Sequence, residues 1–217
     1  MAYKAILIGA SGLIGSNLLS ILLDSPEYYE IVILVRNKLS LQHPKLTQHI
    51  IDFDKLESHS ALITGHVIFS CLGTTKKQTQ DKKQYYKIDH DYPLQLAQLA
   101  RQNGVSQFHV VSSIGANKDS SFFYVRTKGE SEDDLKKVGL QTLHIYQPSM
   151  LIGERKGIRA IESFYGAVFK IIDPLLVGGL KKYRSVTGAK VAQAMYKHSL
   201  EQAAGTFTHT SDQINNI

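Results

Sequence analysis

Short apolar runs recur along the first 150 residues of the chain, and most of them lack a polar residue at every second position. Such runs are typical of strands that are buried on both faces of a parallel sheet. The six predicted strands are Lys4–Ile8, Glu30–Val35, Gln48–Ile51, His66–Cys71, Gln107–Ser112 and Gln141–Tyr146.

Helical patterns lie between several of these strands. The three predicted helices are Gly12–Leu23, Tyr92–Asn103 and Ser120–Lys137. Asp91 is the expected N-cap of the second helix, which carries Pro93 in its first turn. The connection between residues 36 and 47 is short and contains Pro44, so no full helix is expected there. Alternating strands and helices predict βαβ units in a doubly wound, three-layer α/β fold with a parallel sheet.

The pattern changes after residue 150. The segment Ile158–Ile172 places apolar side chains at helical spacing. We expect a helix that packs its apolar face on the domain near the cleft, with a membrane-surface helix and a partner-binding helix as alternatives. The length of 217 residues fits one domain.

Charge and cysteine content narrow the function classes. The chain has 25 Lys+Arg against 19 Asp+Glu, a net charge of +6, and no run of five like charges. This mild excess suits a polyphosphate ligand, and a nucleic-acid partner is not expected. The single cysteine, Cys71, argues against a disulfide framework and a Cys-rich zinc module, and it favours a reducing, cytoplasmic location.

Two further sequence features argue against membrane association and against a metal site. The uncharged stretch Ala5–Leu23 is long enough to span a bilayer, but glycine, serine and asparagine interrupt it, so no membrane association is expected. The nine histidines show no metal-ligand spacing along the chain, and no metal site is expected.

A glycine-rich turn joins the first strand to the first helix in the spacing Gly9-x-x-Gly12-x-x-Gly15. Gly9 allows the tight turn, Gly12 lets the backbone approach a pyrophosphate, and Gly15 lets the helix pack close to the strand. The helix N-terminus adds free N–H groups and the positive end of its dipole. We therefore expect a Rossmann-like dinucleotide site, with a turn that only packs as the alternative. The expected contacts are Gly9, Ser11, Gly12, Leu13, Ile14 and Gly15.

The end of the second strand bears on which dinucleotide is bound. An acidic residue at this position binds the ribose 2′-OH of NAD, whereas this chain has Arg36, followed by Asn37 and Lys38. A guanidinium can form a bidentate pair with a 2′-phosphate. We expect NADP(H) as the preferred cofactor and NAD(H) as the alternative. The alternative is that Arg36 and Lys38 lie in a solvent-exposed basic turn that binds no ligand.

A Tyr-x-x-x-Lys pair, Tyr124 and Lys128, lies on the predicted helix that follows the fifth strand. This spacing puts both side chains on one helix face, where a Lys ammonium favours the phenolate form of a Tyr. That strand ends in Ser112 and Ser113. We expect Ser113 to hold a substrate carbonyl, because side chains alternate along a strand and Ser112 then points the other way. The alternative is an exposed Tyr and Lys beside a capping serine.

The glycine spacing and the Ser-Tyr-Lys set resemble the short-chain dehydrogenase/reductase superfamily. The segments CLGTT, VVSSIGANKDSSFFYVRTKGESE and YQPSMLIG resemble its atypical branch, which contains the Tat-interacting-protein-like oxidoreductases. Gln147 departs from the Arg that family members often have, Asn37 replaces a second basic residue, and the family's proton-relay Asn has no clear counterpart. The resemblance implies further cofactor contacts from Asp52, Leu72, Gly73, Thr74, Lys128, Leu151 and Arg159. Arg155 is the alternative to Arg159, and capping of the helix that starts near Asp54 is the alternative role of Asp52.

The resemblance implies an NADP(H)-dependent oxidoreductase that moves a hydride between nicotinamide and a small carbonyl or alcohol. Tyr124 would be the general acid/base. A dinucleotide-sensing module with little turnover and an NAD-dependent epimerase or dehydratase are the alternatives. Members of the superfamily commonly pair through a four-helix bundle, so a homodimer is one implied assembly. We expect residues 1–217 to form one domain, with a dinucleotide-binding core over 1–150 and a small substrate-side extension over 151–217.

Overall fold

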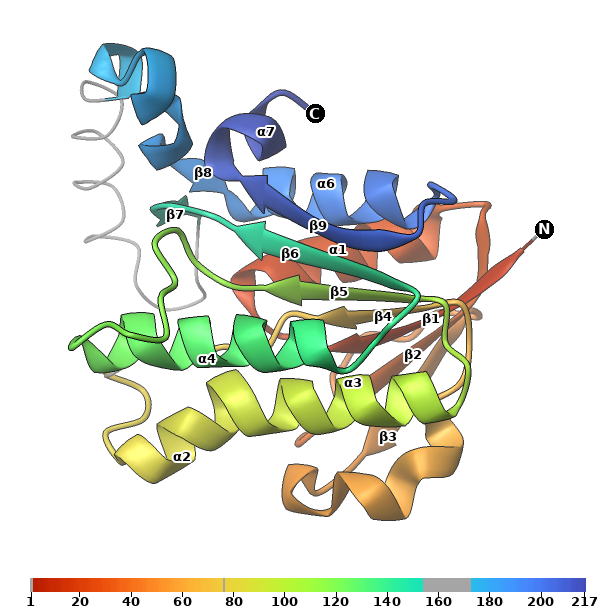
Figure 1. Ribbon diagram of the computed structural model, residues 1–217. Helices are drawn as coiled ribbons and strands as arrows, with labels where there is room; N and C mark the ends of the chain where they lie inside the picture. Colours follow the sequence, from red (N-terminus) through yellow and green to blue (C-terminus); the bar gives the residue numbers. More distant parts are fainter. Residues whose placement is uncertain (1, 76, 154–172) are drawn as a thin grey trace.

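A seven-stranded, all-parallel sheet forms the centre of the computed structural model, which describes residues 2–75, 77–153 and 173–217 (Figure 1). The strands lie in the spatial order β3-β2-β1-β4-β5-β6-β9. Their bounds are β1 Tyr3–Ile8, β2 Tyr28–Val35, β3 Leu46–Ile50, β4 Val67–Ser70, β5 Gln107–Val111, β6 Thr142–Gln147 and β9 Gly205–Thr210. This is the doubly wound order: successive strands are added toward one edge from β1 to β3 and toward the other edge from β4 onward.

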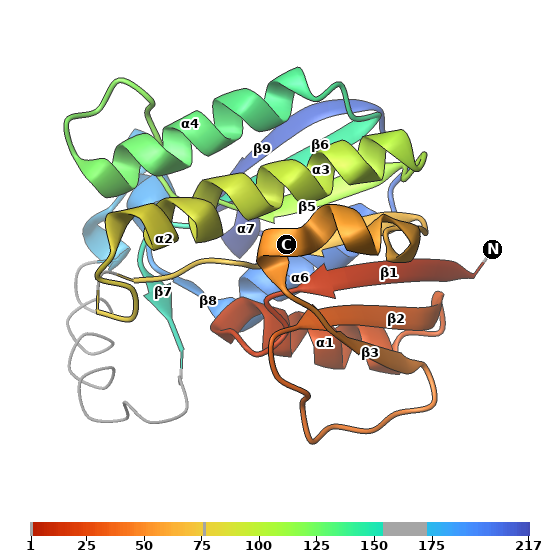
Figure 2. The same ribbon diagram turned by 90° about the horizontal axis from the view of Figure 1, so that it is seen from below.

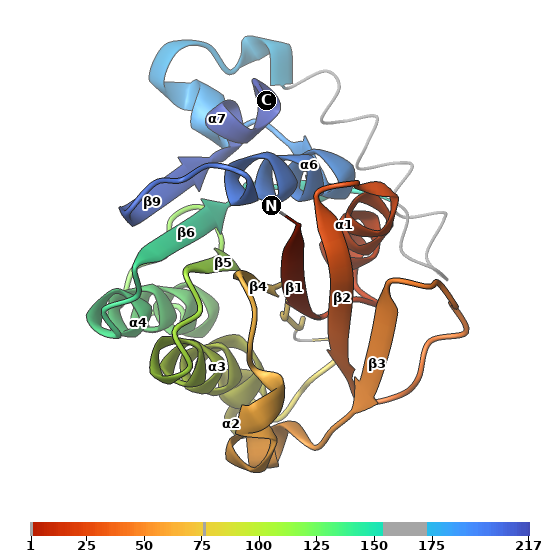
Figure 3. The same ribbon diagram turned by 90° about the vertical axis from the view of Figure 1, so that its right-hand side faces the viewer.

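Helices cover both faces of the sheet, so the molecule has the expected three layers (Figure 3). Helices α1 and α6 pack together on one face, and α3 and α4 lie side by side on the other (Figure 2). The helices are α1 Leu13–Asp24, α2 Lys82–Tyr86, α3 Tyr92–Gln102, α4 Phe123–Lys137, α6 Gly188–Ser199 and α7 Ser211–Asn215. The predicted α/β fold is confirmed.

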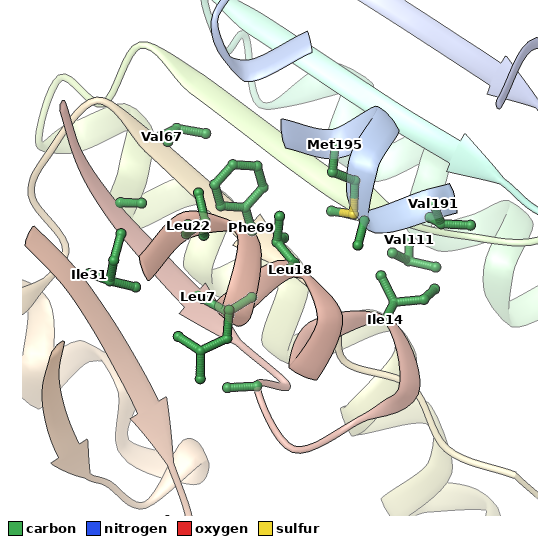
Figure 4. Close-up of a cluster of buried hydrophobic side chains, with 14 of the residues drawn as sticks. Leu7, Ile14, Leu18, Leu22, Ile31, Val67, Phe69, Val111, Val191 and Met195 are labelled. Carbon is green, nitrogen blue, oxygen red and sulfur yellow. The ribbon is translucent and has the colours of Figure 1, made fainter. Parts of the chain in front are cut away.

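The strands are apolar on both faces because each face is covered. In β1, Ala5 and Leu7 belong to the core beneath α1 and α6, whereas Ile6 and Ile8 belong to the core beneath α3 and α4. Figure 4 shows the first core, in which Leu18 of α1 and Met195 of α6 meet over the sheet. Burial of this kind is the main stabilising contribution to the fold.

Smaller elements surround this frame. Strands β7 (Leu151–Ile152) and β8 (Val186–Thr187) pair as a separate two-stranded parallel sheet. Turns of 3₁₀ helix occur at Phe53–Leu62, Asp173–Leu175 and Gly178–Tyr183. Among the described residues, no helix combines the length and apolar character needed to cross a bilayer.

The six predicted strands are all present, and no helix forms between residues 36 and 45, as expected. Strand β9 was not predicted, and it pairs with β6 from Thr142 opposite Gly205 to Gln147 opposite Thr210. Since α6 also packs on α1, the main sheet and its helix layer continue past the expected boundary at residue 150. The expected helix over 158–172 lies outside the described residues.

The predicted N-cap at Asp91 is wrong. Asp91 has helical backbone angles, and a π-helical turn, Lys87–Asp91, joins α2 to α3 without a break. The helical path therefore begins ten residues earlier, where the Asp81 side chain accepts from the Lys83 N–H at 2.9 Å. Pro93 has no N–H to donate, and the α-helical pattern is interrupted in the turn immediately before it.

Candidate active site

A pocket of about 900 Å³ lies at the carboxyl ends of β1, β2 and β4, the edge at which doubly wound sheets bind ligands. It contains the glycine turn, the end of β2 and the loop after β4. The predicted cofactor contacts that line it are Gly9, Ser11, Gly12, Leu13, Arg36, Asp52, Leu72, Gly73 and Thr74.

The glycines of the turn are required by contacts of the backbone. Gly9 has φ +77°, and a Cβ there would lie 2.4 Å from the carbonyl oxygen of Cys71. A Cβ at Gly15 would lie 2.1 Å from the carbonyl oxygen of Gly9, so only glycine lets α1 start this close to β1. Helix α1 has Gly12 as its N-cap, with no side-chain hydrogen bond and no acidic residue in its first turn. Its first N–H groups and its dipole therefore remain available to a pyrophosphate, which fits this cradle.

Arg36 and Asp52 line the part of the pocket where the sequence predicts that the adenosine of the cofactor binds. Arg36 is exposed at the end of β2 and makes no hydrogen bond or ion pair with any residue that the structure describes. Its guanidinium is therefore available to an anionic ligand. The Asp52 side chain accepts from the Asp54 N–H at 3.0 Å, so it caps the 3₁₀ segment and lines the pocket at the same time.

Several predicted contacts lie outside the pocket lining. Ile14 is buried in the core beneath α1 and α6, where the partly buried Leu151 also packs. Gly15 serves the packing of α1 on β1, and Asn37 is exposed just beyond Arg36. Arg159 lies outside the described residues.

The second part of the site lies at the end of β5. The Ser113 side chain is 8% exposed, and its Oγ is buried with no hydrogen-bond partner among the described residues. Ser112 instead donates to the buried Glu132 of α4. Gln147 donates from Nε2 to both oxygens of the same carboxylate, at 2.9 and 3.0 Å. The residue that departs from the family's Arg therefore holds Glu132 together with Ser112, and Ser113 remains the free hydroxyl of the pair.

Lys128 is held by a buried ion pair. Its Nζ lies 2.7 Å from Asp89 Oδ1, with side-chain exposures of 8% and 1%, and it also donates to the Val111 carbonyl at 3.3 Å. Burial lowers the pKa of Lys128, but the charge interactions with Asp89 and Tyr124 outweigh it and raise the pKa above its usual value. The ammonium therefore stays protonated at neutral pH.

Asp89 joins the two parts of the site. Its Oδ2 accepts from the backbone N–H of Thr74 at 3.1 Å, in the loop that lines the glycine pocket. The same carboxylate binds Lys128, one helical turn after Tyr124 on α4. Tyr124 is 44% exposed and makes no hydrogen bond with any described residue, so its hydroxyl is open to a ligand.

Sequence reasoning missed Asp89, because it placed the start of this helix at Asp91. The π-helical turn instead places Asp89 inside the helical path, 2% exposed and facing Lys128. Such turns frequently mark functional sites. An aspartate four residues before Pro93, in an otherwise helical pattern, was the available signal.

Comparison with known proteins identifies the family of the chain. The family model described as NAD(P)H-binding matches residues 9–170, about three quarters of the chain. The chain belongs to this family. It is 32% identical over 170 residues to Protein HTATIP2 of Rattus norvegicus, covering 75% of this chain and 70% of that protein. It is also 30% identical over 222 residues to the mitochondrial protein fmp52 of Aspergillus clavatus, covering 96% and 92%.

Solved structures share the fold at low identity. The Bordetella bronchiseptica enzyme WbmH, in complex with NAD⁺, has a TM-score of 0.72 at 15% identity, over 97% of this chain and 76% of that one. A UDP-glucose 4-epimerase of Thermotoga maritima has a TM-score of 0.70 at 15% identity, over 98% and 79%. The expected resemblance is confirmed at the level of the family: the chain belongs to the NAD(P)H-binding family, is related to HTATIP2 and fmp52, and shares its fold with the NAD⁺-bound enzyme WbmH.

The same comparison corrects the expected location. The fmp52 relatives, including one of Saccharomyces cerevisiae that is 34% identical over 156 residues, are named mitochondrial proteins. The cytoplasmic prediction is contradicted by these names. It rested on the single cysteine, which argues against a disulfide framework but does not distinguish one reducing compartment from another.

Proposed function

We propose that the protein is an NADP(H)-dependent oxidoreductase acting on a small carbonyl or alcohol. The observation that carries this proposal is the link through Asp89. One carboxylate contacts both Lys128, on the helix of Tyr124, and Thr74, in the lining of the glycine pocket. Asp89 thereby connects the helix that carries the proton-transfer group to the loop that lines the dinucleotide cradle, and hydride transfer requires these two parts to be fixed relative to each other.

The glycine turn and α1 bind the pyrophosphate, and Arg36 pairs with a 2′-phosphate, which supports NADP(H) over NAD(H). When bound, the reduced nicotinamide supplies the hydride. Ser113 donates its unpartnered hydroxyl to the substrate carbonyl and orients it. Tyr124 donates the proton to the developing alkoxide. Lys128 keeps a positive charge beneath Tyr124, and Asp89 fixes the position of that charge.

The proposal is tested by comparing the turnover of Tyr124→Phe with that of the native chain. A panel of small aldehydes and ketones is screened with NADPH, and the best substrate is used to compare variants. We expect Tyr124→Phe to lose about 10²- to 10⁴-fold in kcat, the usual contribution of a general acid. Its NADPH affinity should remain that of the native chain. Tyr29→Phe, an exposed tyrosine on β2, is the matched control and should keep full activity.

Unchanged turnover in Tyr124→Phe would reject the catalytic assignment. Tight NADPH binding without turnover on any member of the panel would favour the alternative of a dinucleotide-sensing module. Cofactor that survives purification as NAD would favour the epimerase or dehydratase alternative.

A further inference from the structure

Three histidines meet at the β9 edge of the sheet, away from the residues that line the cofactor pocket. His144 lies on β6, His209 on the neighbouring β9, and His198 on α6, which packs over this face. One ring nitrogen from each lies within 4.8 Å of those from the other two. Their spacing along the chain hides the cluster, because its members lie on three separate elements, β6, β9 and α6, which are neighbours in the fold (Figure 1).

The nitrogens of this cluster are not fully satisfied by the protein. His144 is 1% exposed, and its Nε2 is buried without a partner in the described part of the chain. The Nε2 of His198 is also buried and without a described partner. A buried polar atom without a hydrogen bond costs about 1–3 kcal/mol. The unpartnered Nε2 of His198, in a cluster of three histidines with ring nitrogens within 4.8 Å of one another, indicates a ligand that the histidines are arranged to hold.

A hydrogen bond to Glu201 orients His198 in the way that a metal ligand requires. His198 Nδ1 lies 3.0 Å from Glu201 Oε1, and an Nδ1–H donated to this carboxylate leaves the lone pair on Nε2. A histidine that donates its other nitrogen to a carboxylate is the usual outer arrangement of a metal site. Glu201 therefore fixes the tautomer in which His198 can bind a cation.

His144 Nδ1 and His209 Nε2 lie 2.9 Å apart and share one proton. A divalent ion with metal–nitrogen bonds of about 2.0–2.1 Å needs ligand nitrogens about 3.3 Å apart in tetrahedral geometry. A small rotation of the three rings therefore brings the cluster to coordination distance.

We propose that His144, His198 and His209 bind one Zn²⁺ ion at the β9 edge of the sheet. Three neutral imidazoles without a thiolate suit Zn²⁺, and the partial exposure of His198 and His209 leaves room for a water as the fourth ligand. The ion would join β9 and α6 to β6. This site is independent of the proposed redox chemistry.

The test is equilibrium dialysis of the untagged, EDTA-treated full chain against Zn²⁺, with metal content measured per chain. We expect one equivalent, a rise in the melting temperature on binding, and visible absorption from tetrahedral Co²⁺ used in its place. His209→Asn and His198→Gln should each weaken binding about a hundredfold. Glu201→Gln should weaken it about tenfold, the usual effect of losing an outer-shell partner.

The matched control is His49→Asn, a histidine on β3 at the opposite edge of the same sheet. It should bind Zn²⁺ as the native chain does. Circular dichroism checks the fold of each variant, and His198→Gln, on the surface helix α6, keeps the test valid if a strand variant fails to fold. No stoichiometric uptake by the native chain, or uptake that both His209→Asn and His198→Gln leave unchanged, would overturn the proposal.

Discussion

The two halves of the candidate site are built in different ways. The glycine cradle is local, since β1, its turn and α1 follow one another within residues 3–24. The catalytic half is assembled over long distances, with Lys128 from α4, Asp89 from the π-helical turn and Thr74 from the loop after β4. In the glycine cradle, a Cβ added at Gly9 or Gly15 would clash with backbone atoms. In the catalytic half, loss of Lys128 or Asp89 would leave the other charge buried without its partner. The cradle therefore depends on close backbone packing, and the catalytic half depends on a buried ion pair.

The largest effect expected from this difference is in the catalytic half. Lys128→Met leaves the Asp89 carboxylate buried with only the Thr74 N–H as partner, so we expect a loss of about 3–5 kcal/mol in unfolding free energy. Urea denaturation followed by circular dichroism measures it. Lys137→Met is the control, because Lys137 pairs with Asp133 and Asp134 at the exposed surface, and its denaturation midpoint should hardly move. Equal shifts in the two variants would contradict the buried pair.

In the glycine half, the corresponding change is Gly15→Ala. The added Cβ would lie 2.1 Å from the Gly9 carbonyl oxygen, which is backbone and cannot swing aside. We expect a loss of about 3 kcal/mol in stability, measured in the same denaturation assay. Gly73→Ala, whose Cβ meets its nearest neighbour at 3.8 Å, is the control and should keep native stability. A Gly15→Ala protein as stable as Gly73→Ala would show that α1 does not need its close approach to β1.

A smaller effect is expected when Asp89 loses its charge but keeps its shape. Asp89→Asn keeps the side-chain volume but removes the charge that raises the pKa of Lys128, so burial then lowers that pKa. Because the mechanism needs a protonated Lys128, activity should decline at a lower alkaline pH than in the native enzyme, with the acid side unchanged. The pH profile of kcat measures this shift. Asp133→Asn, at an exposed carboxylate, should keep the native profile, and an unshifted Asp89→Asn profile would refute the role of Asp89.

The sequence was informative wherever structure depends on neighbours along the chain. The glycine spacing predicted the β1–α1 turn, because a positive φ at Gly9 and the tight contact at Gly15 are demands on single positions. Apolar runs located the first six strands of the sheet, since burial on both faces leaves a continuous hydrophobic pattern. These features need no knowledge of which distant residue lies opposite.

Features that depend on distant partners escaped the sequence. Asp89 has a function only because a π-helical turn presents it to Lys128. His144 and His209 become neighbours only when β9 joins β6. Strand β9 is an edge strand with threonine at alternate positions, Thr206, Thr208 and Thr210, and this alternation was its available signal. Short polar edge strands resemble loops until their partner is known.

Calorimetric titration of the purified, cofactor-free protein with NADPH and NADH tests whether the glycine pocket binds a dinucleotide and whether Arg36 selects NADP(H). We predict that NADPH binds more tightly than NADH. In Arg36→Ala the NADPH affinity should fall about tenfold or more, as expected for a lost charge-assisted hydrogen bond, while NADH binding hardly changes. Arg101→Ala, an exposed arginine on α3, should bind both as the native chain does. Binding of neither dinucleotide by the folded protein would contradict the account.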